Sequence, residues 1–100
     1  MTSVRWTRGA IEDLKEIRSY IALDDAKAAA RWIQRLRERA GLASHNPGAG
    51  RVVPEFGRDD IREVFVRSYR LVYRALPAEI HVLTVFEGRR LLHPSDISDE

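Results

Sequence analysis

The fold is decided by the stretch IREVFVRSYRLVYR, which occupies residues 61–74. β-Branched and aromatic side chains recur along it, and such side chains favour the pleated, half-buried surface of a β-strand. Ser68 interrupts the run. The stretch therefore predicts one strand at 61–67 and a second at 69–76, joined by a tight turn.

A third run of β-forming residues follows at 79–86, after the pair Pro77–Ala78. A proline between two such runs is typical of a turn, so the three runs predict an antiparallel meander. The third run is apolar at nearly every position, unlike the two before it. We expect it to be a central strand or a strand covered on both faces.

Two amphipathic helices are predicted ahead of this meander. Apolar residues recur three and four positions apart at about 8–22, where Thr7 is the expected N-cap, and again at about 25–44. Two helices joined by a few residues form an antiparallel hairpin. The apolar residues expected to face the core are Ala10, Ile11, Leu14, Ile17, Tyr20, Ile21, Ala29, Ile33, Leu36, Ala40 and Ala43.

The predicted fold class is α+β. A short N-terminal strand at Val4–Trp6 precedes the helix hairpin, which packs on one face of a mainly antiparallel sheet completed by the C-terminal meander. Proline and glycine mark residues 45–60 as a loop with a short extended piece at 51–53. We expect a single domain over residues 1–100, with a frayed tail at 95–100.

Composition excludes several classes of function. The chain has no cysteine, which excludes a disulfide framework, a thiolate metal site and a cysteine nucleophile. Its His and carboxylate residues show no metal-ligand spacing, and no phosphate-binding glycine loop is present, so no metal and no cofactor are predicted. No apolar run approaches the ~20 residues that a membrane span needs. We expect a soluble, cytoplasmic protein without a signal peptide and without a role at a membrane.

Arginine is the residue that carries chemical information here. It accounts for all but two of the 17 basic residues, and its planar guanidinium binds carboxylates and phosphates bidentately. Because side chains alternate along a strand, Arg70 and Arg74 share one face of the sheet. Such arginines either pair with acidic residues at the sheet edges or form a surface for an anionic partner, a nucleic acid or an acidic peptide. The arginines within and directly after the predicted strands are Arg62, Arg67, Arg70, Arg74, Arg89 and Arg90. The carboxylates available to pair with them are Glu55, Glu63, Glu79 and Glu87.

Four short motifs along residues 4–90 carry a family resemblance. They are Val4-Arg5-Trp6-Thr7 with Ala10, Asp13-Leu14, Ile17 and Tyr20-Ile21; Leu42 with Asn46-Pro47 and Gly50-Arg51; Ile61-Arg62-Glu63 with Tyr69-Arg70-Leu71-Val72-Tyr73; and Ile80 with Val82-Leu83, Val85 and Gly88-Arg89-Arg90. In this order and spacing the chain resembles the RelE/ParE superfamily of small bacterial toxins, and its ParE branch above all. The resemblance implies the fold described above, and a toxin that is neutralised by a cognate antitoxin.

The superfamily contains two activities. RelE-like members cut mRNA on the ribosome, whereas ParE-like members share the fold but are associated with inhibition of DNA gyrase. Cleavage of RNA needs a base, an acid and cations around the phosphate, which RelE-like members supply with clustered Lys, Arg, Glu or His and often a C-terminal Tyr. Here Lys15 and Lys27 both lie in the helical region, and the last tyrosine is Tyr73. These features favour the ParE-like activity, which is not enzymatic.

The ParE interpretation predicts contacts with DNA gyrase through Arg67, Arg70, Arg74, Arg89 and Arg90. None of these residues is expected to be catalytic. The resemblance further implies a ParD-like antitoxin, or a similar small acidic protein. We expect that antitoxin in the groove between the helix hairpin and the sheet.

Two alternatives stay open at this point. The first is a RelE-like, ribosome-dependent mRNA endoribonuclease, in which Arg62, Arg70 and Arg89 hold phosphate and His93 transfers a proton. The second is a non-toxic interaction module on the same fold.

Overall fold

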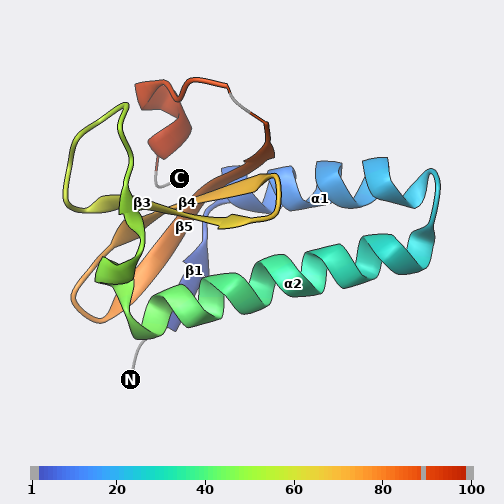
Figure 1. The fold of residues 1–100 in the computed structure, drawn as a ribbon, viewed down its shortest axis with the longest axis horizontal. Helices are drawn as coiled ribbons and strands as arrows, with labels where there is room; N and C mark the ends of the chain where they lie inside the picture. Colours follow the sequence, from blue (N-terminus) through green and yellow to red (C-terminus); the bar gives the residue numbers. More distant parts are fainter. Residues whose placement is uncertain (1–2, 89, 99–100) are drawn as a thin grey trace.

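A five-stranded sheet forms the centre of the computed structural model, which describes residues 3–88 and 90–98 (Figure 1). The strands lie in the order β1-β5-β4-β3-β2, with β1 parallel to β5 and every other neighbouring pair antiparallel. Their bounds are Ser3–Trp6 for β1, Arg51–Val52 for β2, Ile61–Val66 for β3, Tyr69–Ala75 for β4 and Glu79–Glu87 for β5.

Two antiparallel helices, α1 (Arg8–Ala22) and α2 (Ala26–His45), cover one face of this sheet (Figure 1). Each begins at the residue that its cap dictates: the Thr7 hydroxyl accepts from the amide of Ala10, and the Asp25 carboxylate caps α2 in the same way. The predicted α+β fold, a helix hairpin on a mainly antiparallel sheet, is therefore confirmed. No helix in the described part of the chain is long and apolar enough to cross a membrane.

The run at 79–86 is a central strand, as predicted, because β5 lies between β1 and β4. Its apolar side chains serve both faces of the sheet. Ile80, Val82 and Val85 pack under the helices, while Leu83 and Phe86 join a smaller cluster on the opposite face. This division explains why the strand is apolar at nearly every position.

The predicted helix core is confirmed only in part. Ala10 and Leu14 are buried and Ile17 and Ile21 pack against the core, but Tyr20 is 71% exposed and Ile11 is exposed too. Tyr20 belongs to the last turns of α1, where the closed end of the hairpin extends past the sheet (Figure 1). Ile11, near the start of α1, lines a groove between the two helices together with Ile33.

The C-terminal segment differs from the predicted frayed tail at 95–100. Pro94–Ile97 forms a 3₁₀ helix, and Ile97 packs with the buried Leu92 against the smaller cluster. The backbone N–H of His93 donates to the carboxylate of Asp96 and caps this turn. Only residues 99 and 100 of the predicted tail lie outside the described residues. Short 3₁₀ turns lack the periodicity that reveals longer helices in a sequence.

Asp13 of α1 contacts the sheet at a β-bulge between β4 and β5. The pairing of β4 with β5 shifts by one residue between Val72 and Tyr73, which is a β-bulge. Directly after the bulge, the carboxylate of Asp13 accepts from the Thr84 hydroxyl at 2.7 Å and from the Val85 amide at 3.0 Å. One acidic side chain of α1 thus satisfies two donors at the point where the ladder is disturbed.

The turn between β3 and β4 begins one residue earlier than predicted. Val66 pairs with Tyr69, so the turn consists of Arg67 and Ser68. Arg67 has a φ of 55°, in the left-handed region that suits glycine. A side chain in this conformation costs roughly 1–2 kcal/mol.

Replacing Arg67 with glycine should stabilise the fold. Relief of the left-handed strain outweighs the extra entropy that glycine gives the unfolded chain, so we expect Arg67→Gly to raise the free energy of unfolding by about 0.5–1 kcal/mol. Arg18→Gly in the interior of α1 is the matched control and should lower it by about 1 kcal/mol. Denaturant titration measures both values. A destabilised Arg67→Gly chain would show that the arginine side chain itself holds the turn.

Candidate functional site

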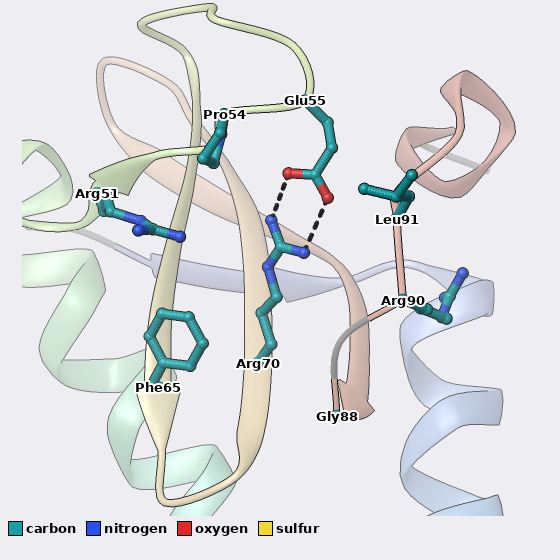
Figure 2. A pocket seen from close by; sticks show the side chains of 8 residues that line it. All are labelled: Arg51, Pro54, Glu55, Phe65, Arg70, Gly88, Arg90 and Leu91. Atoms are coloured by element: carbon teal, nitrogen blue, oxygen red, sulfur yellow. Dashed lines mark hydrogen bonds and ion pairs between the residues drawn. The ribbon is translucent and has the colours of Figure 1, made fainter.

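A cleft of about 570 Å³ opens on the face of the sheet that the helices leave uncovered (Figure 2). The loop that follows β2 and the segment that follows β5 stand on its two sides. We call it the open-face cleft. It is lined by Arg51, Pro54, Glu55, Phe65, Arg70, Gly88, Arg90 and Leu91.

The guanidinium of Arg70 occupies the floor of the open-face cleft. Strand pairing sets Arg70 opposite Phe65 and diagonal to Glu63, which lies on the same face of β3. Its terminal nitrogens donate to the two carboxylate oxygens of Glu55 at 2.9 Å and 2.8 Å, and its Nε donates to Glu63. Arg70 is only 7% exposed, so this arginine is paired rather than presented to a partner.

The carboxylate of Glu55 is held ionised. Hydrogen bonds from Arg70 lower the pKa of Glu55 from 4.5 to about 2, against the opposing effect of burial. The bond that Glu55 accepts from the backbone N–H of Leu92 lowers this pKa further. The same ion pairs raise the pKa of Arg70. Glu63 is buried and also binds Arg51, which completes the cluster.

Three of the predicted target-binding arginines secure the C-terminal segment. Arg70 does so through Glu55, whose Oε2 accepts from the Leu92 amide at 3.0 Å. Arg74 binds Asp60 at 3.1 Å, and it donates to the backbone carbonyl of Ile97 at 3.2 Å. Arg90 pairs with Asp96 in the same segment. The contacts of Arg70 and Arg74 hold the segment against the open face of the sheet, and the Arg90–Asp96 pair lies within the segment itself.

The structure does not gather the described target-binding candidates at one point. Arg70 and Arg90 both line the open-face cleft, but Arg90 points away from Arg70 and rests on the ring of Phe86, 4.2 Å from its centroid (Figure 2). Arg67 is exposed in the β3–β4 turn. Arg89 lies outside the described residues.

Of the described residues of the alternative nuclease site, Arg62 and Arg70 lie on opposite faces of the sheet. Arg62 shares the helix-covered face with Val64, and it donates to the carbonyls of Gly48 and Gly50. Arg70 lies on the opposite face of the sheet, and His93 is exposed at the start of the 3₁₀ helix.

Sequence reasoning missed the residues that organise this site. Glu55 was considered only as one of several carboxylates available to the arginines, yet it joins β4, its own loop and the C-terminal segment. Phe65, 50% exposed beneath the Arg51 guanidinium, and Leu91, 74% exposed, were not singled out. The signal in the sequence was a Phe that shares one strand face with the charged Glu63 and Arg67. Among residues 3–88 and 90–98, no group of His, Asp or Glu is arranged to hold a metal ion.

A second, smaller groove of about 280 Å³ lies between α1 and the ends of β4 and β5, which is where the antitoxin was expected. We call it the helix-side groove. Tyr20 and Tyr69 provide aromatic surface there, and its charged lining residues are Asp13, Glu16, Glu87 and Arg90.

Comparison with known proteins decides the family. The family model described as "ParE toxin of type II toxin-antitoxin system, parDE" matches residues 4–92. The chain belongs to the ParE toxin family. It is 32% identical over 90 residues to the protein described as "Putative toxin Y4kP" from Sinorhizobium fredii (strain NBRC 101917 / NGR234), covering 87% of this chain and 88% of that protein.

A solved structure shares the ParE fold. It is described as the chromosomal ParDE TA system from P. aeruginosa, with a TM-score of 0.72 and 23% sequence identity. The match covers 89% of this chain and 98% of that one. At this level of identity the likeness supports the architecture, which agrees with the helix hairpin and sheet described above.

The low pKa of Glu55 makes a prediction about acid stability. The folded chain binds this proton less tightly than the unfolded chain, so the ionised carboxylate stabilises the fold above pH 4.5, and this contribution is lost as the pH falls toward about 2. The difference between 4.5 and about 2 corresponds to roughly 3 kcal/mol.

Glu55→Gln should therefore lower the free energy of unfolding at neutral pH by about 3 kcal/mol, and flatten its decline between pH 4.5 and 2. Glu12→Gln on the exposed side of α1 is the matched control and should change neither quantity. Urea titrations across this pH range provide the measurement. If the free energy of unfolding of Glu55→Gln declined with acid as steeply as that of the unaltered chain, the low pKa would not belong to Glu55.

Proposed function

We propose that this ParE-family chain is the toxin of a type II toxin–antitoxin pair, that it inhibits DNA gyrase by binding it, and that a ParD-like or similar small acidic antitoxin neutralises it. The match of the ParE model to residues 4–92 supports the toxin assignment. The gyrase target and the antitoxin are what membership of the family suggests for this chain.

Binding is favoured over bond cleavage by the state of Arg70, the observation that carries this part of the proposal. Arg70 belongs to both predicted site sets, and Glu55 and Glu63 bind its guanidinium from two sides. A guanidinium neutralised in this way is a poor ligand for an RNA phosphate. The separation of Arg62 from Arg70 by the sheet also argues against a phosphate site built from both.

The proposed target contacts are of two kinds. Arg67 and Arg90 are exposed and can form charge-assisted hydrogen bonds with carboxylates of a partner. Arg70 and Arg74 act indirectly, since they hold the C-terminal segment that presents Arg90. Arg89 is a further proposed contact, from its place beside Arg90 in the sequence.

The gyrase target is tested with purified chain in a DNA supercoiling assay. We expect inhibition by the unaltered chain, and an inhibitory concentration raised by about tenfold in Arg90→Ala and in Arg67→Ala, because each loses a charge-assisted contact. Arg18→Ala, an exposed arginine on α1, is the matched control and should inhibit normally. Thermal unfolding of each variant separates lost contacts from lost folding.

Three results would contradict the proposal. Gyrase that stays active at high excess of folded chain would exclude the target. Codon-phased cuts in mRNA after induction, abolished by His93→Ala, would support the endoribonuclease instead. Normal growth on overexpression without an antitoxin would support a non-toxic interaction module.

A further inference from the structure

The charge of α2 is predominantly positive. The helix carries one acidic residue, Glu38, whose carboxylate accepts a hydrogen bond from Gln34. Its five cationic residues are Lys27, Arg31, Arg35, Arg37 and Arg39. In α1 the two signs balance, with three cations and three carboxylates, namely Arg8, Lys15, Arg18, Glu12, Asp13 and Glu16. The net charge of +2 for the whole chain therefore conceals one strongly basic helix.

Four of the cations of α2 form a single row, which we call the α2 basic row. Lys27, Arg31, Arg35 and Arg39 follow one another at intervals of four residues, so their side chains are neighbours on the helix surface. At about 1.5 Å per residue the row is roughly 18 Å long. The first three side chains are exposed and Arg39 is half-buried. Within residues 3–88 and 90–98, none of the four forms a salt bridge with a carboxylate.

The α2 basic row does not serve the stability of its own helix. Like charges four residues apart repel each other, and the row contains three such pairs. Lys27 lies in the first turn of α2, where the helix dipole disfavours a cation. A helix face that serves solubility alone mixes both signs, as α1 does. The row therefore indicates a ligand that offers negative charge along a line.

The surface that carries the row is separate from the sites described above. α2 covers one face of the sheet, whereas Arg90 and the C-terminal segment belong to the opposite face (Figure 1). Neither the open-face cleft nor the helix-side groove is lined by a residue of the row. A ligand can therefore contact the row while Arg90 remains available to a protein target.

The chemistry of the row favours the phosphate backbone of duplex DNA. A duplex carries one negative charge per about 1.7 Å of its axis, and guanidinium groups bind phosphates bidentately. Single-stranded nucleic acid is held largely by bases that stack on accessible aromatic rings. The tryptophan of α2, Trp32, is half-buried against Tyr69, and the Arg35 guanidinium lies 5.3 Å from its ring centre. An acidic peptide also needs pockets for its apolar side chains, and the row lines neither groove.

We propose that the α2 basic row binds the phosphate backbone of duplex DNA without reading the base sequence. Lys27, Arg31 and Arg35 donate charge-assisted hydrogen bonds to phosphate oxygens, and Arg39 adds positive charge at the end of the row. The inference goes beyond the proposed inhibition of gyrase, because the DNA contact needs no protein partner. It gives the chain a hold on the DNA on which its proposed target acts.

The test measures how binding to DNA depends on salt. A fluorescein-labelled duplex of arbitrary sequence is titrated with the full chain, and anisotropy gives the dissociation constant at several salt concentrations. We expect values between about 10⁻⁴ and 10⁻⁶ M at physiological salt. The logarithm of the binding constant should fall against the logarithm of salt with a slope between about −2.7 and −3.6, which corresponds to three or four neutralised phosphates. A duplex of different sequence should bind within about twofold.

Two double variants of equal net charge locate the surface. Arg31→Gln/Arg35→Gln removes two cations of the row, and Lys15→Gln/Arg18→Gln removes two from α1. We expect the first variant to bind more than about tenfold more weakly and to lose about 1.8 from the magnitude of the slope, while the second keeps the slope. Glutamine is almost as good a helix former as arginine, so both variants should show normal circular dichroism. If the first variant is unfolded, protection of Arg31 and Arg35 from phenylglyoxal by duplex DNA in the unaltered chain decides the question.

Four results would overturn the proposal. The absence of binding at low salt would exclude a DNA contact, and an equal loss of slope in both variants would assign the binding to diffuse net charge. Tighter binding of single-stranded RNA than of the duplex would assign the row to RNA. Displacement of the duplex by poly-glutamate at a lower concentration of charge than by unlabelled duplex would assign it to an acidic protein. The assay contains no gyrase, so its failure and a failure of the supercoiling assay are distinguishable.

Discussion

The buried guanidinium of Arg70 is the constraint on which the uncovered face of this sheet depends. Removing a guanidinium from water is costly, and the cost is offset only where its donors are paired in good geometry. Glu55 supplies two oxygens and Glu63 a third, while Arg51 balances the second carboxylate. None of these groups can be removed without leaving an uncompensated charge in a buried place.

This cluster determines where the chain goes after its central strand. Glu55 has one oxygen that serves both Arg70 and the amide of Leu92, so the ion pair and the path of the C-terminal segment are linked. Leu92 and Ile97 then pack their side chains against the open face of the sheet. The open-face cleft is the space left between this segment and the loop that carries Glu55. Its shape therefore follows from an electrostatic requirement rather than from apolar packing alone.

Much of the architecture could be predicted from the sequence because local signals agreed with the final packing. Thr7 and Asp25 mark the two helix starts, and the apolar run of β5 identifies the central strand. The sequence places Arg67 in a strand because arginine, unlike glycine or asparagine, does not indicate a left-handed turn conformation.

The site was harder to predict. Alternation correctly placed Arg70 on the same face as Arg74, but its partner Glu55 comes from a loop without periodicity, 15 residues earlier in the chain. Residue spacing carries no information about such a contact.

The bridge from Asp13 to the bulge has a consequence for how the chain is made. It joins residues 71 and 72 positions apart, and β1 likewise pairs in parallel with the last strand to be synthesised. On the ribosome, α1 and β1 emerge long before β5, the strand that both require, so an interior position of the sheet is filled last. Folding dominated by such distant contacts is slow to begin. The nascent chain therefore cannot complete its fold until translation has passed Glu87.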